Sequence, residues 1–380
     1  MRILFLIRSL GLGGAEVQLA QLARGLNERG HAVQVATLYA GGAMWERLSA
    51  AGVQCVHLDK RSRWDLLSPL QKLREIAQSF RADVVYSFMP AANVLAALAR
   101  RRFASAALVW GVRASRAEWG FYGTFPALLT RIEGWLSSRP DLILCNSQAG
   151  RHYYSQAGWR AERMEVVENG FDLEAFRPDP EGRLRVRREL DVPPERCVVG
   201  IVGRIDPIKD HESFLRMAAV LRAQGRECEF WCVGGGDAGY VARLQALAAE
   251  LGVAPVVRWL GTRQDMRAVY SALDVSCLTS LAEGFPNVAG ESMACGTPCV
   301  AFEVGDAAAL IGDEALVVRN RDARQLATAI VRALDADSLR ERSRARIAEN
   351  FSLQRCIERS EACLQRVIGP STVNRQPSTR

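Results

Sequence analysis

The sequence predicts an α/β protein with two doubly wound, parallel-sheet domains of similar size that face a central cleft. Three observations predict this fold. Short apolar runs alternate with helical patterns, which is typical of parallel strands joined by helices. The alternation stops once, at the proline- and charge-rich stretch 176–182, and then begins again. The 380 residues are also enough for two domains of ordinary size, each with its own core.

The first domain is expected to span residues 1–178. Its helical patterns are illustrated by 15–29, where apolar residues recur at spacings of two to four and predict an amphipathic helix. Six apolar runs are predicted as strands: Arg2–Ile7, Val33–Leu38, Asp83–Phe88, Ala107–Val112, Leu142–Asn146 and Glu165–Val167.

The second domain is expected to span residues 179–350. Five runs are predicted as its strands: Cys197–Val202, Glu229–Val233, Val256–Leu260, Val275–Leu278 and Pro298–Phe302. A last helix, 351–369, is expected to pack back toward the first domain. The polar tail 370–380 is expected to be disordered, as chain ends often are.

The composition is that of a soluble globular protein, with 49% apolar and 24% charged residues. No apolar run approaches the ~18–20 residues of a membrane span. The apolar stretch Ile3–Ile7 is shorter than the ~7–15 residues of a signal-peptide core, so a cytoplasmic protein is expected. The ten cysteines lack zinc-site spacing and neighbouring histidines, which predicts structural thiols and no metal site.

The net charge of +7 comes mainly from the first half of the chain. Any one basic run is most simply a solvated surface. Several such runs lie among aromatic residues, which favours an anionic partner. Because no nucleic-acid motif accompanies them, an anionic membrane surface is the better prediction and nucleic acid is not expected. The residues concerned are Lys60, Arg61, Arg63, Arg100, Arg101, Arg102, Arg113 and Arg116, with Trp64, Trp119, Phe121 and Tyr122 among them.

A glycine-rich turn, Gly11–Glu16, follows the first predicted strand and opens a helix. Its backbone amides would suit a phosphate, although a glycine loop that only turns the chain is equally compatible. The turn resembles the dinucleotide fingerprint GxGxxG, but Glu16 replaces the third glycine. The second strand also lacks the acidic residue that would hold an adenosine ribose, which disfavours a nicotinamide dehydrogenase.

The first strand of the second domain leads into Gly203, Arg204 and Lys209. Ligands bind beyond the carboxyl ends of strands in open α/β sheets, and Asp210 is predicted to cap the following helix. An arginine and a lysine on such a loop are suited to clamp a diphosphate, the simpler alternative being two solvated cations. Gly261 and Arg263 belong to another glycine turn of this kind.

Two glutamates, Glu283 and Glu291, flank the predicted start of a helix at Asn287. Pro286 suits the first turn, and the amides of the next residues, together with the helix dipole, favour an anion. Glu291 is then placed to accept hydrogen bonds from a ribose diol, and Glu283 to meet the hydroxyls of a sugar. Two carboxylates around an anion site predict a nucleotide diphospho-sugar better than they predict a solvated helix face.

These motifs together resemble those of retaining glycosyltransferase family 4, which has the GT-B fold of two Rossmann-like domains. The resemblance covers nearly the whole chain and rests on four stretches. They are Gly13–Glu16, Val167–Asp172, Gly203–Asp210 and Glu283–Val300, of which the last two are the most specific.

The resemblance implies a metal-independent, cofactor-free enzyme that transfers a hexose from a nucleotide sugar, UDP-sugar above all. The acceptor would be a glycan or polyprenyl-diphosphate-linked saccharide, bound by the first domain in cell-surface polysaccharide assembly at the inner face of the membrane. The second domain would hold the donor. Glu283, Arg204 and Lys209 are implied as the catalytic residues. The implied donor-binding residues are Gly14, Gly203, Arg204, Lys209, Gly261, Arg263, Glu283, Phe285, Pro286, Asn287, Val288 and Glu291.

One feature departs from the family pattern. Many relatives place a histidine near the transferred sugar after a middle strand of the first domain, whereas this strand leads into Arg113 and Ser115. Those two residues and Asn169 are therefore the candidates for the acceptor or sugar side. A nucleotide-sugar epimerase of the same fold and a non-catalytic nucleotide-sugar-binding module remain alternatives.

Overall fold

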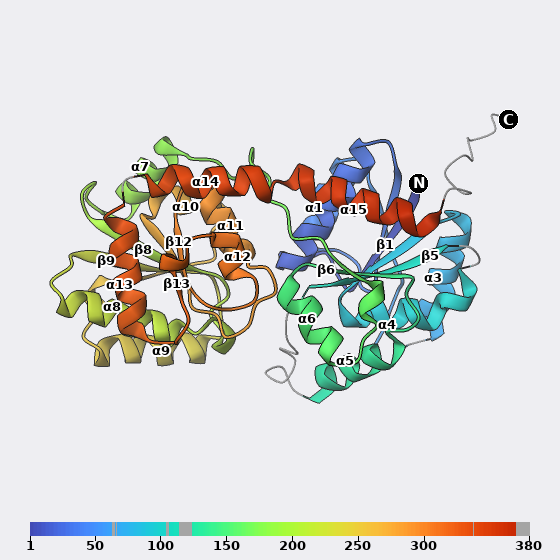
Figure 1. Ribbon diagram of the computed structural model, residues 1–380, viewed down its shortest axis with the longest axis horizontal. Coiled ribbons are helices and arrows are strands. Elements are labelled where there is room, and N and C mark those ends of the chain that lie inside the picture. Colours follow the sequence, from blue (N-terminus) through green and yellow to red (C-terminus); the bar gives the residue numbers. More distant parts are fainter. Residues whose placement is uncertain (63–64, 66, 104–105, 114–123, 337, 370–380) are drawn as a thin grey trace. The chain divides into compact units, whose positions relative to one another are not determined.

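The computed structural model describes residues 1–62, 65, 67–103, 106–113, 124–336 and 338–369 (Figure 1). The chain forms two compact units. Unit 1 contains Met1–Gly170 and the chain from Leu353 onward, and unit 2 contains Phe171–Ser352. The sequence had placed the boundary at 178/179, within the first residues of unit 2. The predicted tail 370–380 lies outside the described residues.

Unit 1 is built on a parallel sheet in the order β3-β2-β1-β4-β5-β6-β7. The central strand β1 pairs with β2 on one side, through Ile3 and Val33, and with β4 on the other, through Ile3 and Val84. The strands are β1 (Arg2–Ile7), β2 (Ala32–Thr37), β3 (Gln54–His57), β4 (Val84–Phe88), β5 (Ala107–Val112), β6 (Leu142–Cys145) and β7 (Met164–Val166).

Helices cover both faces of this sheet. Successive side chains of β1 from Ile3 onward point to opposite faces, and both sets are apolar and buried. Ile3 and Phe5 lie in the core that contains α1 and α15, and Leu4 lies in the core that contains α3 and α4. α1 and α15 pack tightly at Gly25 of α1, where a Cβ would lie 2.2 Å from Ile357 Cδ1 of α15. The helices are α1 (Gly14–Glu28), α2 (Ala43–Ala50), α3 (Leu67–Ser79), α4 (Met89–Ala99), α5 (Thr124–Leu136), α6 (Gln148–Gln156) and α15 (Leu353–Ile368).

Unit 2 repeats the plan with the strand order β10-β9-β8-β11-β12-β13. Its strands are β8 (Cys197–Val202), β9 (Cys228–Val233), β10 (Val257–Gly261), β11 (Val275–Leu278), β12 (Cys299–Phe302) and β13 (Val317–Val318). Its helices are α7 (Pro180–Glu189), α8 (His211–Ala223), α9 (Ala238–Glu250), α10 (Met266–Ala272), α11 (Asn287–Ala294), α12 (Ala307–Ile311), α13 (Ala323–Leu334) and α14 (Leu339–Asn350).

The strand order brings predicted site residues of unit 2 together at the carboxyl end of its parallel sheet. β8 and β11 are neighbours in the middle of the sheet, and their carboxyl ends lead to the loops that carry Lys209 and Glu283. All ten cysteines are free thiols. No helix among the described residues is long and apolar enough to cross a membrane.

Candidate active site

Two of the three predicted catalytic side chains of unit 2 are in direct contact. Lys209 Nζ lies 2.6 Å from Glu283 Oε1, and both side chains are largely buried. A charge-assisted hydrogen bond of this kind orients both groups more firmly than an exposed ion pair would. The structure therefore brings together two predicted residues that are 74 positions apart in the chain.

The turn that carries Lys209 is held by hydrogen bonds on both sides. It is a short 3₁₀ helix, Pro207–Lys209, whose amino end is capped by the Asp206 carboxylate through Ile208 N at 3.0 Å. The Thr279 hydroxyl donates to the Lys209 carbonyl at 2.8 Å. Leu281 N donates to the Ile208 carbonyl at 2.7 Å. The Lys209 turn and the loop that leads to Glu283 are thus fixed to each other through their backbones.

Arg321 is a further residue of this assembly that the sequence did not reveal. Its guanidinium lies 2.5 Å from the Asp210 carboxylate and donates to the carbonyls of Ser280, at 2.9 Å, and Thr279. The same guanidinium lies over the Phe302 ring, 4.5 Å from its centre. Arg321 therefore joins the residue after Lys209 to the loop before Glu283. Nothing in the local sequence pairs it with either loop.

Asp210 links this turn to the next helix. As predicted, it caps α8: its carboxylate accepts from Ser213 N at 3.1 Å. Its φ of 49° lies in the left-handed region, which a non-glycine residue adopts at a cost that its surroundings must offset. The bonds from Ser213 and Arg321 hold Asp210 in this conformation.

Arg204 is the more exposed of the two predicted clamp cations. Its side chain is 67% exposed and its Nη2 lies 3.0 Å from Asp206 Oδ2, so the Asp206 carboxylate meets both the Lys209 turn and Arg204. The preceding Gly203 has a φ of 146°. A Cβ at the neighbouring Gly234 would lie 1.9 Å from the Gly203 carbonyl oxygen, so this close approach between β8 and β9 requires glycine.

The loop that carries Glu283 is hydrogen-bonded to, and packs closely against, a turn after β12. Asp306 N donates to the Gly284 carbonyl at 3.0 Å. Gly305, with a φ of 51°, lies so close that a Cβ there would be 2.3 Å from the Glu283 carbonyl oxygen. Phe285 is a core residue, 4% exposed, with its ring 6.2 Å from that of Phe171. Its implied contribution to donor binding could come only from its backbone.

The helix after this loop begins as predicted. Pro286 has an extended φ and ψ of −76° and 105° and caps α11, whose first residues are Asn287 and Val288. No side chain caps this amino end. The arrangement keeps the helix dipole directed toward the loop that holds Glu283.

Glu291, one turn into α11, is paired with a residue that the sequence did not indicate. The Tyr270 hydroxyl donates to Glu291 Oε2 at 2.8 Å. Burial raises the pKa of Glu291 to about 7, and the hydrogen bond from Tyr270 opposes this rise. Tyr270 orients the carboxylate and leaves the Oε1 atom to accept other donors. A carboxylate so placed can receive a hydroxyl pair, which is the role predicted for it.

Arg263 is held by two carboxylates of its own unit. Its guanidinium contacts Glu189 at 2.5 and 2.9 Å and Asp265 at 2.9 Å. The hydrogen bonds to Glu189 raise the pKa of Arg263. Gly261, with a φ of 63°, makes the turn after β10. The donor-binding role implied for these two residues stays a prediction, since a ligand would compete with both carboxylates for Arg263.

In unit 1, two of the predicted acceptor-side residues lie together. Arg113 donates to the Asn169 side chain at 3.1 Å and to the Tyr86 hydroxyl at 3.2 Å, and its guanidinium lies 4.4 Å from the centre of the Phe88 ring. Ser115, the third candidate, lies outside the described residues. Arg113 is thus oriented at the end of β5 by partners from two other segments, β4 and the loop that carries Asn169.

The remaining predicted residue of unit 1, Gly14, is the first residue of α1. Gln18, one turn further, forms a two-way amide pair with Gly170: it donates to the Gly170 carbonyl at 3.0 Å and accepts from its amide at 3.2 Å. Gln18 is 6% exposed. It fixes the Asn169–Gly170 backbone to α1, and no sequence motif indicates this pairing.

Across the described part of the chain, no group of three or more His, Cys, Asp or Glu side chains is arranged to hold a metal ion. Metal-independent chemistry remains a prediction, carried by the Arg204 and Lys209 cations.

Comparisons with known proteins agree with the motifs. The model of the family described as "Glycosyltransferase Family 4" matches residues 12–175, and that of "Glycosyl transferases group 1" matches residues 196–336. The chain belongs to glycosyltransferase family 4. The first match lies almost wholly in unit 1 and the second within unit 2, so each unit matches a glycosyltransferase model.

Among curated relatives, the D-inositol 3-phosphate glycosyltransferase of Thermobispora bispora is 38% identical over 185 residues, 46% of this chain and 43% of the relative. That of Mycobacterium marinum is 36% identical over 231 residues, 57% of this chain and 48% of the relative. The chain therefore spans about half the length of the curated relatives that it matches.

Solved structures match over almost the whole chain. Anabaena Alr3699/HepE in complex with UDP is 26% identical, with a TM-score of 0.82 over 96% of this chain and 99% of that one. Its complex with UDP-glucose has the same identity and a TM-score of 0.83, over 95% and 98% of the two chains. The GT-B fold predicted for this family 4 chain is confirmed.

Proposed function

We propose that this chain is a retaining glycosyltransferase that transfers a hexose from a UDP-sugar to a glycan or polyprenyl-linked saccharide in cell-surface polysaccharide assembly. The observation that supports it most is the Lys209–Glu283 contact of 2.6 Å beside the amino end of α11, with Glu291 one turn further along. The binding of UDP and UDP-glucose by the similar Anabaena protein supports the donor class.

In the proposed reaction the bond between the sugar C1 and the β-phosphate oxygen breaks while the acceptor oxygen attacks C1 from the same face. The leaving phosphate takes up the acceptor proton, so UDP departs and the anomeric configuration is kept. Arg204 and Lys209 neutralise the charge that grows on the diphosphate, as a divalent ion does in other enzymes. Glu283 orients Lys209 and accepts hydrogen bonds from the hexose.

The release of UDP from a panel of UDP-hexoses tests this proposal, with and without a chelator of divalent metals. Arg204→Ala and Lys209→Ala should each lower transfer by about 30–10³-fold, because removal of a charge-stabilising group costs roughly 2–4 kcal/mol. Arg222→Ala is the control, since Arg222 is exposed at the other end of α8. Normal activity in either site variant would show that the diphosphate is bound elsewhere. An inverted product anomer would exclude the retaining mechanism.

An inositol phosphate is a second candidate acceptor. The curated relatives named above act, by their names, on D-inositol 3-phosphate. Parallel assays with an inositol phosphate and a lipid-linked saccharide distinguish the two acceptor classes. Transfer to neither, with UDP release intact, would instead support a binding or hydrolytic role.

We further propose that unit 1 attaches the enzyme to the cytoplasmic face of an anionic membrane. Trp135 and Leu128 of α5 are 80% and 51% exposed, and the exposed Arg131 lies between them on the same face. The aromatic residues on which the sequence prediction rests, Trp64, Trp119, Phe121 and Tyr122, all lie outside the described residues.

Cosedimentation with anionic vesicles tests the membrane proposal. Binding should fall as salt rises, since each basic residue near the surface contributes only ~1 kcal/mol. Trp135→Ala should weaken it, whereas Leu184→Ala, at an exposed position of unit 2, should not. Absence of binding at low salt would contradict the proposal.

A further inference from the structure

Two cysteines of unit 2 lie side by side on neighbouring strands. Cys197 is the first residue of β8 and Cys228 the first of β9, and they are register partners in the parallel pair. Their side chains are hydrogen-bonded to each other. Among the strand pairs of the described residues, no other register joins two cysteines.

Both thiols line a pocket of about 460 Å³. Cys197 is half-buried and Cys228 is 4% exposed, and the pair borders the pocket from the amino ends of two interior strands. β8 runs from Cys197 to Val202, and the predicted donor loop follows at the far end of the strand. The pocket is therefore separate from the candidate active site within unit 2.

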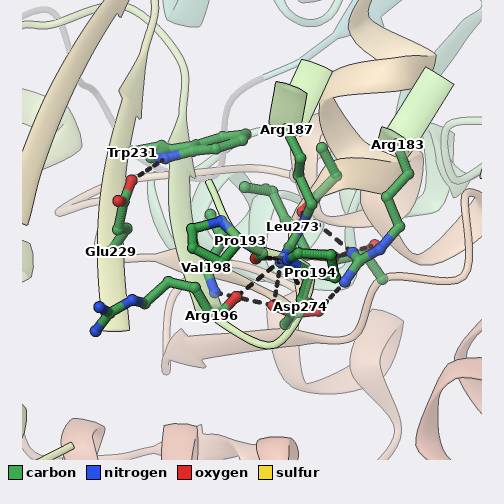
Figure 2. A network of polar contacts seen from close by, with 12 residues as sticks. Arg183, Arg187, Pro193, Pro194, Arg196, Val198, Glu229, Trp231, Leu273 and Asp274 are labelled. Carbon is green, nitrogen blue, oxygen red and sulfur yellow. Dashed lines mark hydrogen bonds and ion pairs between the residues drawn. The ribbon is translucent and has the colours of Figure 1, made fainter. Parts of the chain in front are cut away.

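The arginines that line this pocket, Arg196, Arg226 and Arg340, have carboxylate partners, Asp274 being that of Arg340 at 3.1 Å. Asp274, which also lines the pocket, forms ion pairs with Arg183 at 2.7 Å and Arg187 at 2.6 Å, two residues outside the lining (Figure 2). Arg196 contacts Glu227 at 3.1 Å and Arg226 contacts Asp335 at 3.4 Å. The guanidinium groups thus have carboxylate partners, which argues against a dedicated anion site. The two thiols are the nucleophilic groups that the pocket presents.

The contact between the thiols divides their roles. The hydrogen bond from Cys197 lowers the pKa of Cys228; burial and the Asp274 charge oppose this, and the positive charges of Arg226 and Arg196 add to it. Because Cys197 donates that bond, its own pKa is raised. The thiolate is the reactive form of cysteine, so Cys228 is suited to react first and Cys197 second.

We propose that Cys197 and Cys228 form a peroxide-sensitive dithiol that closes reversibly to a disulfide. Neighbouring strands lie about 4.7–4.9 Å apart, within the roughly 4.4–6.8 Å that disulfide-linked Cα atoms span. The pair can therefore close with little movement of the backbone.

The proposed chemistry is a two-electron oxidation by hydrogen peroxide. The Cys228 thiolate attacks one peroxide oxygen, the O–O bond breaks, and the released hydroxide takes up a proton to form water. The sulfur of Cys197 then attacks the resulting sulfenic acid, the S–O bond breaks, and a second water leaves with the Cys197 proton. The two thiols lose two electrons and two protons, and one peroxide is reduced to two waters.

Intact-mass analysis of the full chain after treatment with stoichiometric peroxide tests this proposal. The expected product is lighter by two hydrogens, is restored by dithiothreitol, and yields a cross-link between the tryptic peptides 197–204 and 227–243. The second peptide also contains Cys232, which is fully buried, so Cys232→Ser is the matched control and should still form the cross-link. Cys197→Ser should abolish it and leave a sulfenic acid on Cys228 that dimedone traps.

A cross-link that survives in Cys228→Ser, or wild-type protein that forms none, would overturn the proposal. A second measurement avoids the variants altogether. Phenylarsine oxide bridges two neighbouring thiols without oxidation. The untreated protein should bind one equivalent of phenylarsine oxide on these two peptides. A monothiol should not remove the arsenical from this adduct, whereas a dithiol should. Failure to bind would show that the sulfurs cannot reach a common partner.

Discussion

Glu133 of α5 is a buried carboxyl whose replacement should change the pH dependence of stability. It is 2% exposed and accepts a hydrogen bond from Asn93 Nδ2 at 2.7 Å; Asn93 in turn accepts from the Ser87 hydroxyl at 2.7 Å. Burial raises the pKa of Glu133 to about 8 from an ordinary value of 4.5, and the bond from Asn93 only partly opposes this. Ionising Glu133 in the folded state therefore costs about 4–5 kcal/mol relative to the unfolded chain.

The sign of the effect follows from proton binding. Between pH 4.5 and about 8 the folded chain holds the Glu133 proton and the unfolded chain does not, so this residue lowers the free energy of unfolding as pH rises. Glu133→Gln keeps the shape and the acceptor for Asn93 but cannot ionise. The variant should therefore be more stable than wild type at about pH 8.5, by up to about 4 kcal/mol, and should gain little at about pH 4.5.

Urea unfolding of both proteins at the two pH values, monitored by hydrogen exchange in α4 and α5, measures the stability difference between variant and wild type within unit 1. Glu46→Gln, at an exposed position of α2, is the control and should shift neither value. A Glu133→Gln variant whose stability differs from that of wild type by the same amount at both pH values would refute the reasoning, because it would show that folding does not shift the pKa of Glu133.

Three further predictions concern unit 2. Arg321→Ala should lower UDP-sugar turnover by about 10–100-fold, since loss of charged hydrogen bonds costs roughly 1.5–3 kcal/mol, and Arg321→Lys should restore part of it; unchanged turnover would show that the loops hold without this clamp. Gly290→Ala should destabilise unit 2 by about 1–3 kcal/mol in thermal unfolding, because a Cβ there would lie 2.0 Å from Phe171 Cζ; an unchanged melting temperature would contradict this packing. UDP affinity, measured by calorimetry, should rise as pH rises through about 7, where Glu291 ionises to the form that accepts hydrogen bonds from the ribose; an affinity that falls over this range would contradict that role.

The sheets could be predicted from the sequence because their strands are short, buried apolar runs between clear turn signals. β1, β5, β8 and β11 have the predicted bounds, and the other predicted strands differ by about a residue at one or both ends. β3 and β13 were missed. β13 has only two residues, Val317 and Val318, and β3 is a half-buried edge strand, so neither carries a strong apolar pattern.

The site could be predicted as a set of motifs but not as an assembly. Lys209 and Glu283 belong to stretches whose residue types indicate their chemistry, yet the 2.6 Å contact between them depends on the β8–β11 pairing. Arg321 and Tyr270 carry no local signal, because an arginine before a helix or a tyrosine within one usually faces solvent or core. Only the folded chain shows that they orient Asp210 and Glu291.

The most direct test of the proposed donor site is whether Glu291 holds the ribose of UDP. Calorimetry compares UDP with 2′-deoxy-UDP on wild type, Glu291→Ala and Glu283→Ala. A charge-assisted hydrogen bond contributes about 1.5–3 kcal/mol, so loss of the hydroxyl should weaken wild-type binding by roughly one to two orders of magnitude. Glu291→Ala should bind both nucleotides equally weakly, because either change removes the same contact, whereas Glu283→Ala should keep the full penalty for the missing hydroxyl. The assignment of the two carboxylates would be contradicted if removal of the 2′-hydroxyl still weakened binding to Glu291→Ala by the full wild-type factor but did not weaken binding to Glu283→Ala.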